Sequence, residues 1–261
     1  MKTSPIALVT GASTGIGAVY ADRFARRGHA LVLVARDAQR LAALAERLRT
    51  EHGCAVEVLT ADLTAADDLA RVEARLQRGD IDVLVNNAGM SLKGGLIDNT
   101  PQALDQIIAL NVSAPTRLCA AAGRAFLAQG RGTIINLSSV LALAPEMFEG
   151  VYSGTKAYLL NLSQALAAQW EPQGLRVQAV LPGATRTELW EKAGRDVDSF
   201  PPGFLMETGD MVDAALVGLD LGETVTLPPL PDDAQFAALQ AARLAMAPNL
   251  SRSEVPARYR R

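Results

Sequence analysis

The architecture expected for this chain follows from one stretch near its start, Ile6-Ala7-Leu8-Val9-Thr10-Gly11-Ala12-Ser13-Thr14-Gly15-Ile16-Gly17. Residues 6–10 have the apolar character of a buried parallel strand, and a helical pattern runs from Ala18 to Arg27. Glycines between a strand and a helix let the backbone turn sharply, and the first N–H groups of the helix can receive a phosphate. The spacing GxxxGxG at this place therefore predicts a phosphate-binding turn, although such glycines can also serve a tight turn alone.

Apolar runs and helical patterns continue to alternate along the chain. Further strands are expected at residues 30–35, 55–60, 81–85, 132–137, 175–181 and 224–227. Strands that alternate with helices predict a parallel sheet. The predicted fold class is α/β: a single-domain Rossmann fold with a doubly wound parallel sheet of about seven strands and helices on both faces. This domain is expected to cover residues 1–227, with a C-terminal tail at 228–261.

Composition narrows the class of protein. Of the 261 residues, 49% are apolar and only 5% aromatic, so the core must consist mainly of Ala, Leu and Val, as suits helices packed on a parallel sheet. The formal charge of −3 argues against a nucleic-acid partner. No apolar stretch reaches the ~18–20 residues of a membrane span, and the strand-like run at residue 6 leaves no room for a signal peptide. We expect a cytoplasmic protein.

Cysteine and histidine are scarce. Cys54 and Cys119 lie far apart and outside any CxxC pattern, as expected of small core residues in a reducing compartment. His29 and His52 stand in polar surroundings and are interpreted as surface residues. The sequence therefore predicts no catalytic or metal site built on histidine.

The end of the second strand bears on the choice of cofactor. In dinucleotide-binding folds an acidic residue there holds the ribose hydroxyls, whereas an arginine accommodates a 2′-phosphate. Here the strand ends in Ala35 and Arg36 follows it. Because a guanidinium suits phosphate well, Arg36 predicts NADP(H) rather than NAD(H). The alternative is that Arg36 is a solvated cap, with Asp37 starting the next helix.

Polar residues follow the later strands as well, each with two interpretations. Asp62 ends the third strand on the expected ligand side, but it or Thr64 could instead cap the next helix. The run Asn86-Asn87-Ala88-Gly89 could satisfy local backbone groups or contact a ligand. Asn111 interrupts a helical pattern, which marks either a kink or a functional group. Ser138 and Ser139 could form a turn or hydrogen-bond a bound carbonyl.

A tyrosine and a lysine share one face of the helix expected at residues 152–170. Tyr152 and Lys156 are four positions apart, so their side chains point the same way. A fixed ammonium favours the phenolate and lowers the pKa of a neighbouring tyrosine from its usual value of about 10. Such a tyrosine can exchange a proton with a carbonyl or alcohol oxygen near neutral pH. The alternative is a surface Tyr–Lys pair on an amphipathic helix.

Taken in order, these motifs resemble those of the short-chain dehydrogenase/reductase family. The resemblance covers about residues 6–227. It implies that Tyr152 is the catalytic acid/base, that Lys156 lowers its pKa and contacts the nicotinamide ribose, and that Ser139, rather than Ser138, binds the substrate oxygen. It also implies that Asn111 holds a water linking Lys156 to solvent, which completes a proton relay.

The same resemblance implies a set of cofactor-binding positions for NADP(H). They are Gly11, Ser13, Thr14, Gly15, Ile16, Gly17, Arg36, Asp62, Leu63, Asn87, Ala88, Gly89, Tyr152, Lys156, Pro182, Gly183, Thr185 and Thr187. Two of them depart from the family pattern. Thr14 stands where many NADP-preferring relatives carry a basic residue, so the 2′-phosphate prediction depends mainly on Arg36. Thr185 replaces the usual branched aliphatic residue.

Two stretches are expected to determine the substrate. Met147 and Phe148 precede the catalytic tyrosine, and Trp190 and Phe204 belong to a glycine- and proline-punctuated segment at about 184–207. We interpret this segment as a lid over an apolar pocket. The alternative is that its large side chains pack into the core or a subunit contact. An apolar lid favours a small hydrophobic ketone, aldehyde or acyl chain as substrate.

The sequence thus predicts an oxidoreductase, an NADP(H)-dependent carbonyl reductase or alcohol dehydrogenase. A 3-oxoacyl-thioester reductase, a hydroxysteroid reductase and a cofactor-binding regulator without turnover remain as alternatives. Family members often pair through the helices expected here at 111–128 and 152–170, so we expect a homodimer or homotetramer. The tail is expected to be an arm packed on its own or a neighbouring subunit, or else a solvated terminus.

Overall fold

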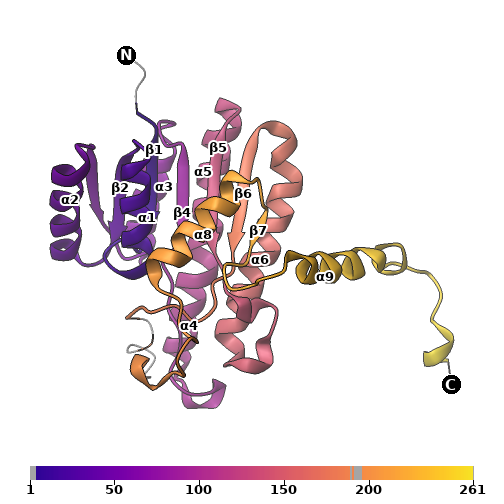
Figure 1. The fold of residues 1–261 in the computed structure, drawn as a ribbon. Helices are drawn as coiled ribbons and strands as arrows, with labels where there is room; N and C mark the ends of the chain where they lie inside the picture. The colour runs from indigo at the N-terminus through magenta and orange to yellow at the C-terminus, as the bar shows by residue number, and fades with distance from the viewer. Residues whose placement is uncertain (1–3, 189, 191–195, 261) are drawn as a thin grey trace. The chain divides into compact units, whose positions relative to one another are not determined.

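The computed structural model of the protein describes residues 4–188, 190 and 196–260. The chain divides into two compact units, Met1–Pro229 and Leu230–Arg261 (Figure 1). The sheet and the candidate site belong to the first unit. None of the helices formed by the described residues is long and apolar enough to cross a membrane.

The described residues of the first unit form a seven-stranded parallel sheet in the order β3-β2-β1-β4-β5-β6-β7. Its strands are β1 (Ile6–Thr10), β2 (Ala30–Ala35), β3 (Val56–Thr60), β4 (Val83–Asn86), β5 (Gly132–Leu137), β6 (Leu175–Val180) and β7 (Val225–Thr226). Leu8 of β1 lies opposite Val32 on one side and Leu84 on the other. The strand order reverses between β1 and β4, and in open parallel sheets ligands bind beside such a reversal, at the carboxyl ends of the strands.

Helices cover both faces of this sheet (Figure 1). They are α1 (Gly15–Arg26), α2 (Ala38–His52), α3 (Ala66–Leu76), α4 (Pro101–Ile108), α5 (Ala114–Gln129), α6 (Gly150–Trp170) and α8 (Thr208–Asp220). One core cluster packs α1, α2 and α8 on the sheet through residues such as Tyr20, Leu41 and Met211. A second packs α3, α5 and α6 through residues such as Phe126 and Leu166. The predicted fold class, a doubly wound parallel sheet, is therefore confirmed.

The glycine-rich turn joins β1 to α1 as expected, and its glycines are needed for its shape. Gly11 adopts φ +65°, which disfavours any residue with a side chain. A Cβ added to Gly17 would lie 2.3 Å from the Gly11 carbonyl oxygen, so the first turn of α1 packs directly on the loop. Helix α1 begins at Gly15, earlier than the expected Ala18, because the glycines themselves enter the helix.

The interpretation of both histidines as surface residues is wrong. The side chain of His52 is only 15% exposed, and its Nε2 lies 3.1 Å from Oδ1 of Asp22. The His29 ring is half-buried and packs edge-on against Phe24, with ring centres 5.0 Å apart. Both histidines contact side chains of α1, Phe24 and Asp22, and the local polarity of the sequence does not reveal these contacts.

The second unit contains α9 (Asp233–Ala245), which is capped by the Asp232 side chain on Ala234 N at 2.9 Å. None of residues 233–245 is buried within this unit. Leu239 and Leu244 are 48% and 59% exposed. A helix of this length gains little stability from its own backbone in water. The role of the tail stays a prediction.

Candidate active site

A cavity of about 780 Å³ opens at the carboxyl ends of the central strands. It is bordered by residues that directly follow four strands: Gly11 after β1, Asn87 after β4, Ser138 after β5 and Pro182 shortly after β6. This is the edge at which parallel sheets of this topology bind ligands. Of the predicted site residues, all but Gly17 and Asn111 line the cavity.

Gly17 and Asn111 lie behind the residues that line the cavity and support them. Gly17 packs against the glycine-rich turn and so shapes it. Asn111 lies in a π-helical turn, Ala109–Ser113, inserted between α4 and α5, and is 2% exposed. Its Oδ1 accepts from Met90 N at 2.9 Å, and its Nδ2 donates to Met90 O at 2.8 Å and to the Thr155 hydroxyl at 3.1 Å. The wider turn thus places this amide against the loop after β4.

The loop after β4 is tied to the glycine-rich turn. Asn87 Nδ2 donates to Thr10 O at 2.8 Å and to Gly11 O at 3.2 Å, while the N–H groups of Asn87 and Ala88 donate to the Thr10 hydroxyl. Gly89 then passes close to the helices behind it. A Cβ there would lie 3.4 Å from Asn111 Oδ1 and 3.5 Å from Lys156 Nζ. Both polar groups therefore border one small volume beside Gly89.

Arg36 faces the cavity, and Asp37 caps the following helix. The Asp37 side chain accepts from Arg40 N at 2.9 Å, which starts α2. The Arg36 side chain is 69% exposed, and its Nη1 lies 3.9 Å from Oδ2 of Asp62. Asp62 itself accepts from the backbone N–H and hydroxyl of Thr64 at 2.9 and 2.7 Å. It therefore both supports the turn before α3 and lines the cavity.

Helix α6 brings Tyr152 and Lys156 to the cavity. Its first turn is capped by Glu149, whose carboxylate accepts from Val151 N and Tyr152 N, each at 2.8 Å. Lys156 is 6% exposed, and its Nζ donates to Leu137 O at 2.7 Å and lies 5.5 Å from the centre of the Tyr152 ring. The alternative of a surface Tyr–Lys pair is thereby excluded.

The two serines after β5 have different partners. The Ser138 hydroxyl donates to Lys156 O at 2.7 Å, so it is engaged in holding α6 against the sheet. The Ser139 hydroxyl accepts from Leu141 N at 3.2 Å, and Ser139 lies near enough to the Tyr152 phenol to lower its pKa. The geometry therefore sets Ser139, rather than Ser138, beside the phenol.

The expectation of a lowered tyrosine pKa is wrong in this structure. Burial, opposed by Ser139 and assisted by the charge of Glu149, raises the pKa of Tyr152 to about 12. Burial also lowers the pKa of Lys156 to about 8. For Tyr152 the cost of burying the phenolate outweighs the opposing hydrogen bond, and for Lys156 burial disfavours the charged form.

The segment after β6 runs along the opposite wall of the cavity. The Thr185 hydroxyl donates to Gly183 O at 3.1 Å, and Trp190 Nε1 donates to Thr185 O at 2.8 Å. The Thr187 methyl group lies 3.4 Å from the position that a Cβ on Gly15 would take. The segment therefore passes close to the glycine-rich turn. Within the predicted lid at 184–207, residues 189 and 191–195 lie outside the described residues.

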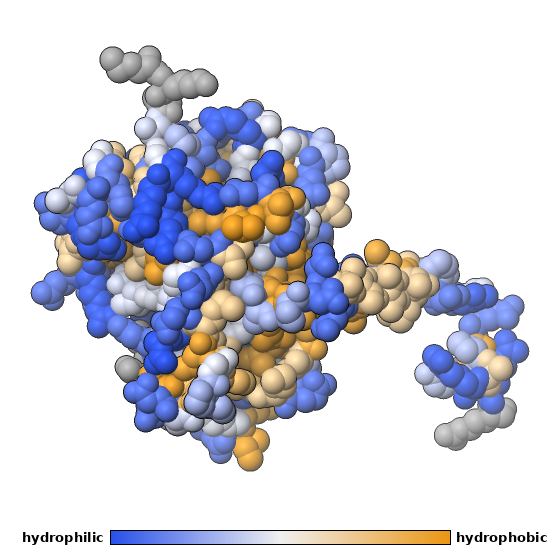
Figure 2. Space-filling model, viewed as in Figure 1, coloured by the Kyte–Doolittle hydropathy of each residue, from blue (hydrophilic) through white to orange (hydrophobic). Residues whose placement is uncertain are grey.

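Aromatic side chains extend from Tyr152 towards solvent, and we call Phe148, Trp190, Phe200 and Phe204 the aromatic wall. Phe148 packs edge-on against Tyr152 and against Trp190, with ring centres 5.8 and 6.4 Å apart. Trp190 contacts Phe200 at 4.8 Å, and Phe200 stacks on Phe204 at 5.5 Å. Phe204 is 51% exposed and Met147, which also lines the cavity, 70%. The face of the first unit in view carries hydrophobic surface around α4 (Figure 2).

Phe200, in the segment expected to form the lid, also lines the cavity. Sequence analysis did not single out Arg40 or Glu188, which line it as well. Arg40 stands four positions after Arg36, on the first turn of α2. Its Nη1 donates to both carboxylate oxygens of Glu188, at 2.9 and 3.0 Å. This contact joins residues 148 positions apart and leaves no local signal in the sequence.

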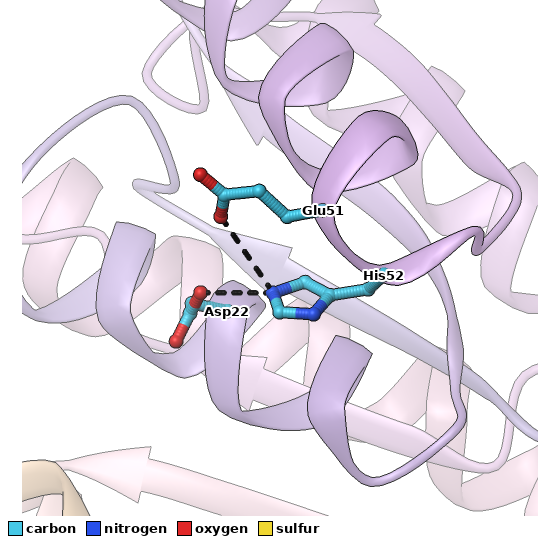
Figure 3. Close-up of side chains that lie close together, drawn as sticks. All are labelled: Asp22, Glu51 and His52. Atoms are coloured by element: carbon cyan, nitrogen blue, oxygen red, sulfur yellow. Dashed lines mark hydrogen bonds and ion pairs between the residues drawn. The ribbon is translucent and has the colours of Figure 1, made fainter.

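A separate ionisable cluster lies between α1 and α2 (Figure 3). Asp22, Glu51 and His52 bring potential ligand atoms within 4.8 Å of one another. Arginines already occupy the carboxylate of Asp22: Arg23 Nη1 and Arg26 Nε lie 2.7 and 3.1 Å from Oδ2. A metal ion would have to displace them, so the chemistry favours an ion-pair network that joins the two helices.

Comparisons with known proteins agree with this geometry. The family model described as short chain dehydrogenase matches residues 5–198. A short-chain dehydrogenase from Sphingobium yanoikuyae, solved in complex with NADPH, is 51% identical with a TM-score of 0.95, covering 98% of this chain and all of that one. The bulky-bulky ketone specific alcohol dehydrogenase from Comamonas testosteroni is 44% identical with a TM-score of 0.90 and 98% coverage of both chains.

A relative of known activity, the D-threitol dehydrogenase of Mycolicibacterium smegmatis, is 34% identical over 194 residues, which span 72% of this chain and 73% of that enzyme. The family model, these relatives and the seven-stranded parallel sheet lead to one assignment: the chain is an oxidoreductase of the short-chain dehydrogenase/reductase family.

Proposed function

We propose that the protein is an NADP(H)-dependent carbonyl reductase or alcohol dehydrogenase that acts on bulky hydrophobic ketones, with Tyr152 as its general acid/base. One observation carries this proposal. The Tyr152 phenol lies beside Ser139 at the inner end of the aromatic wall, in a cavity that also reaches the glycine-rich turn and Arg36.

The residues present fit a nicotinamide dinucleotide phosphate. Gly11, Gly15 and Gly89 line the cavity at the carboxyl ends of β1 and β4, where folds of this topology bind a dinucleotide. Arg36 offers an exposed guanidinium to a 2′-phosphate, and the segment from Pro182 to Thr187 would border the nicotinamide. The Sphingobium relative binds NADPH, which supports this choice of cofactor over NADH. When bound, the cofactor supplies or accepts the hydride.

The chain's own residues handle the proton. Ser139 and Tyr152 would hydrogen-bond the substrate oxygen and stabilise the charge that grows on it. Because burial raises the pKa of Tyr152 to about 12, the phenol holds its proton at neutral pH and can donate it as a ketone is reduced. Asn111 Oδ1 and Lys156 Nζ border the volume beside Gly89, which supports a water-mediated path for proton replacement.

The aromatic wall supports the substrate class. A row of rings favours a large flat or apolar group over a hydroxyl-rich one, because the wall offers it few hydrogen-bond partners. The name of the Comamonas relative points to ketones with two bulky substituents. Reduction of 3-oxoacyl thioesters or hydroxysteroids stays the alternative.

The test is an absorbance assay of NADPH oxidation with a panel of substrates: a diaryl ketone, a small aliphatic ketone, a 3-oxoacyl thioester, an oxosteroid and a sugar ketone. We expect the diaryl ketone to give the highest kcat/KM. Tyr152→Phe should abolish most turnover and leave NADPH binding intact. Absence of turnover on every carbonyl, with intact NADPH binding, would instead favour the regulator without enzymatic activity.

A substitution in the aromatic wall tests whether the wall binds substrate, separately from the catalytic role of Tyr152. Phe200→Ala should raise KM for the diaryl ketone by about 3- to 10-fold, the value of one aromatic contact, and change KM for the small ketone little. Equal effects on both substrates would argue that Phe200 serves packing alone.

We further propose that α5 and α6 form a subunit interface and that the protein is a homodimer or homotetramer. Tyr158, 38% exposed on α6, is hydrogen-bonded to Thr116 of α5 at 2.8 Å, so the two helices present a joined outer surface. Light scattering tests this, and a monomeric mass at micromolar concentration would contradict it.

A further inference from the structure

Besides Arg36, the cavity is lined by a second arginine, Arg40, which already forms an ion pair with Glu188. Arg36, Asp37, Arg40, Asp62 and Glu188 line one end of it, and we call them the arginine cluster. Its ion pairs fall into two groups. Arg36 pairs with Asp62 at 3.9 Å, and Arg40 pairs with Asp37 at 3.5 Å and with Glu188 at 2.9 Å. Two guanidiniums thus face three carboxylates among these described residues.

The carboxylates of this cluster are unfavourable neighbours for a phosphate. A 2′-phosphate is itself anionic, so it would meet like charges at close range. Asp37 and Asp62 are committed to their own elements, since Asp37 caps α2 and Asp62 accepts from Thr64. Glu188 differs from them because it reaches α2 from the segment after β6, 148 positions further along the chain.

We propose that Glu188 is a specificity-determining residue, because its carboxylate competes with the 2′-phosphate of NADP(H) for the Arg40 guanidinium. The inference rests on the proposed function, in which NADP(H) is the cofactor. Arg40 donates from Nη1 to both Glu188 oxygens, at 2.9 and 3.0 Å, and the same planar donor set fits phosphate. NADPH must therefore displace or share this contact, whereas NADH carries no 2′ charge and does not.

Competition and an orienting role predict opposite effects on NADPH binding when the charge of Glu188 is removed. If Glu188 held Arg40 ready for phosphate, its removal would weaken NADPH binding. If it competes, Glu188→Gln keeps the size of the side chain, removes the opposing charge and strengthens NADPH binding. We expect the Kd for NADPH to fall by about 3- to 10-fold, from the repulsion of like charges a few ångströms apart at a solvated site.

The experiment measures Kd for NADPH and NADH by titration calorimetry in four variants and the wild type. Glu188→Gln should tighten NADPH and leave NADH nearly unchanged. Arg40→Gln should weaken NADPH by about 10- to 100-fold, as expected for lost hydrogen bonds to a charged group. In the double variant the gain from Glu188→Gln should disappear, because the competitor acts through Arg40.

Glu207→Gln is the matched control. Glu207 pairs with Arg186 at 3.0 Å, does not line the cavity and changes the net charge by the same amount, so its Kd values should equal those of the wild type.

If the wild type prefers NADPH, any of three outcomes overturns this inference and leaves the proposed function standing. They are a Glu188→Gln variant with unchanged or weaker NADPH binding, an equal gain for both cofactors, and a gain that persists without Arg40. A wild type that binds NADH as tightly as NADPH overturns both the inference and the cofactor assignment.

Discussion

Asp22 and Lys156 are both almost fully buried, at 5% and 6% exposure, but their surroundings are opposite. Asp22 has Arg23, Arg26 and His52 around its carboxylate. Lys156 forms no ion pair with any residue that the structure describes, and its Nζ donates to the Leu137 carbonyl oxygen. The charge of Asp22 is therefore compensated by opposite charges, whereas the charge of Lys156 is buried without an opposite charge beside it among the described residues.

The difference separates a structural charge from a functional one. Although burial alone would raise it, hydrogen bonds from His52 and Arg23 lower the pKa of Asp22, so ionisation of this residue stabilises the fold. Burial lowers the pKa of Lys156, so its ionisation destabilises the fold. A group whose charged form is disfavoured and that faces a cavity is what a catalytic site is expected to contain. The predictions below test this contrast.

The largest expected effect is on turnover. Lys156→Met should lower kcat with NADPH by on the order of 10²–10⁴, the range for a lost proton-transfer group. Asp22→Asn, which changes an equally buried charge, should keep the turnover of the wild type per folded molecule. Steady-state assays on both variants check this. Equal losses in the two variants would remove the distinction.

The next effect is on the pH dependence of stability. Since the folded state holds the pKa of Lys156 near 8 instead of its ordinary 10.5, the unfolded chain binds more protons between these values. Stability should therefore rise with pH through this window, by up to roughly 3 kcal/mol relative to Lys156→Met. Urea denaturation of both proteins at pH 7 and pH 10 measures it. Parallel changes in the two proteins would contradict a buried, titrating lysine.

Asp22 should behave in the opposite way. Asp22→Asn should cost about 1–3 kcal/mol of unfolding free energy at pH 7, as expected for hydrogen bonds to a charged group. Because the folded pKa lies below the ordinary 3.8, this contribution is present above pH 3.8 and is lost as the pH falls through the folded value. Urea midpoints at pH 7 and pH 3 should therefore show the gap between the two proteins closing in acid.

The smallest effect on unfolding free energy is expected at the exposed edge of the ion pairs around Asp22. Arg47 lies 3.6 Å from Asp22 Oδ1 and 2.8 Å from Glu51, but its side chain is 46% exposed. Arg47→Gln should cost no more than about 1 kcal/mol, because water screens an exposed pair. The loss should shrink further in 1 M salt. A cost equal to that of Asp22→Asn would show that the network acts as one unit.

The fold was largely predictable because its signals are local. Apolar runs such as Ile6–Thr10 and Ala30–Ala35 mark buried parallel strands, and both were located to the residue. Much of the candidate site was also accessible, since the carboxyl ends of parallel strands meet at one edge and bring Gly11, Asn87 and Ser139 together.

The remaining features depend on contacts between distant segments. Nothing near Arg40 in the sequence reveals its contact with Glu188, and nothing near His52 reveals Asp22. The pKa of Tyr152 was predicted with the wrong sign because spacing along a helix gives the position of Lys156 but not the desolvation of both groups. Burial and long-range pairing follow from the packed tertiary structure.

Because Trp190 lines the cavity, its intrinsic fluorescence should report on substrate binding. The chain has two tryptophans, and the other, Trp170, packs over Gly123 where α5 meets α6. With Trp170 replaced by Phe, ultraviolet emission would come from the indole that stands between Phe148 and Phe200. Quenching of that emission would then follow the arrival of a ketone in real time, without a label and before any hydride has moved.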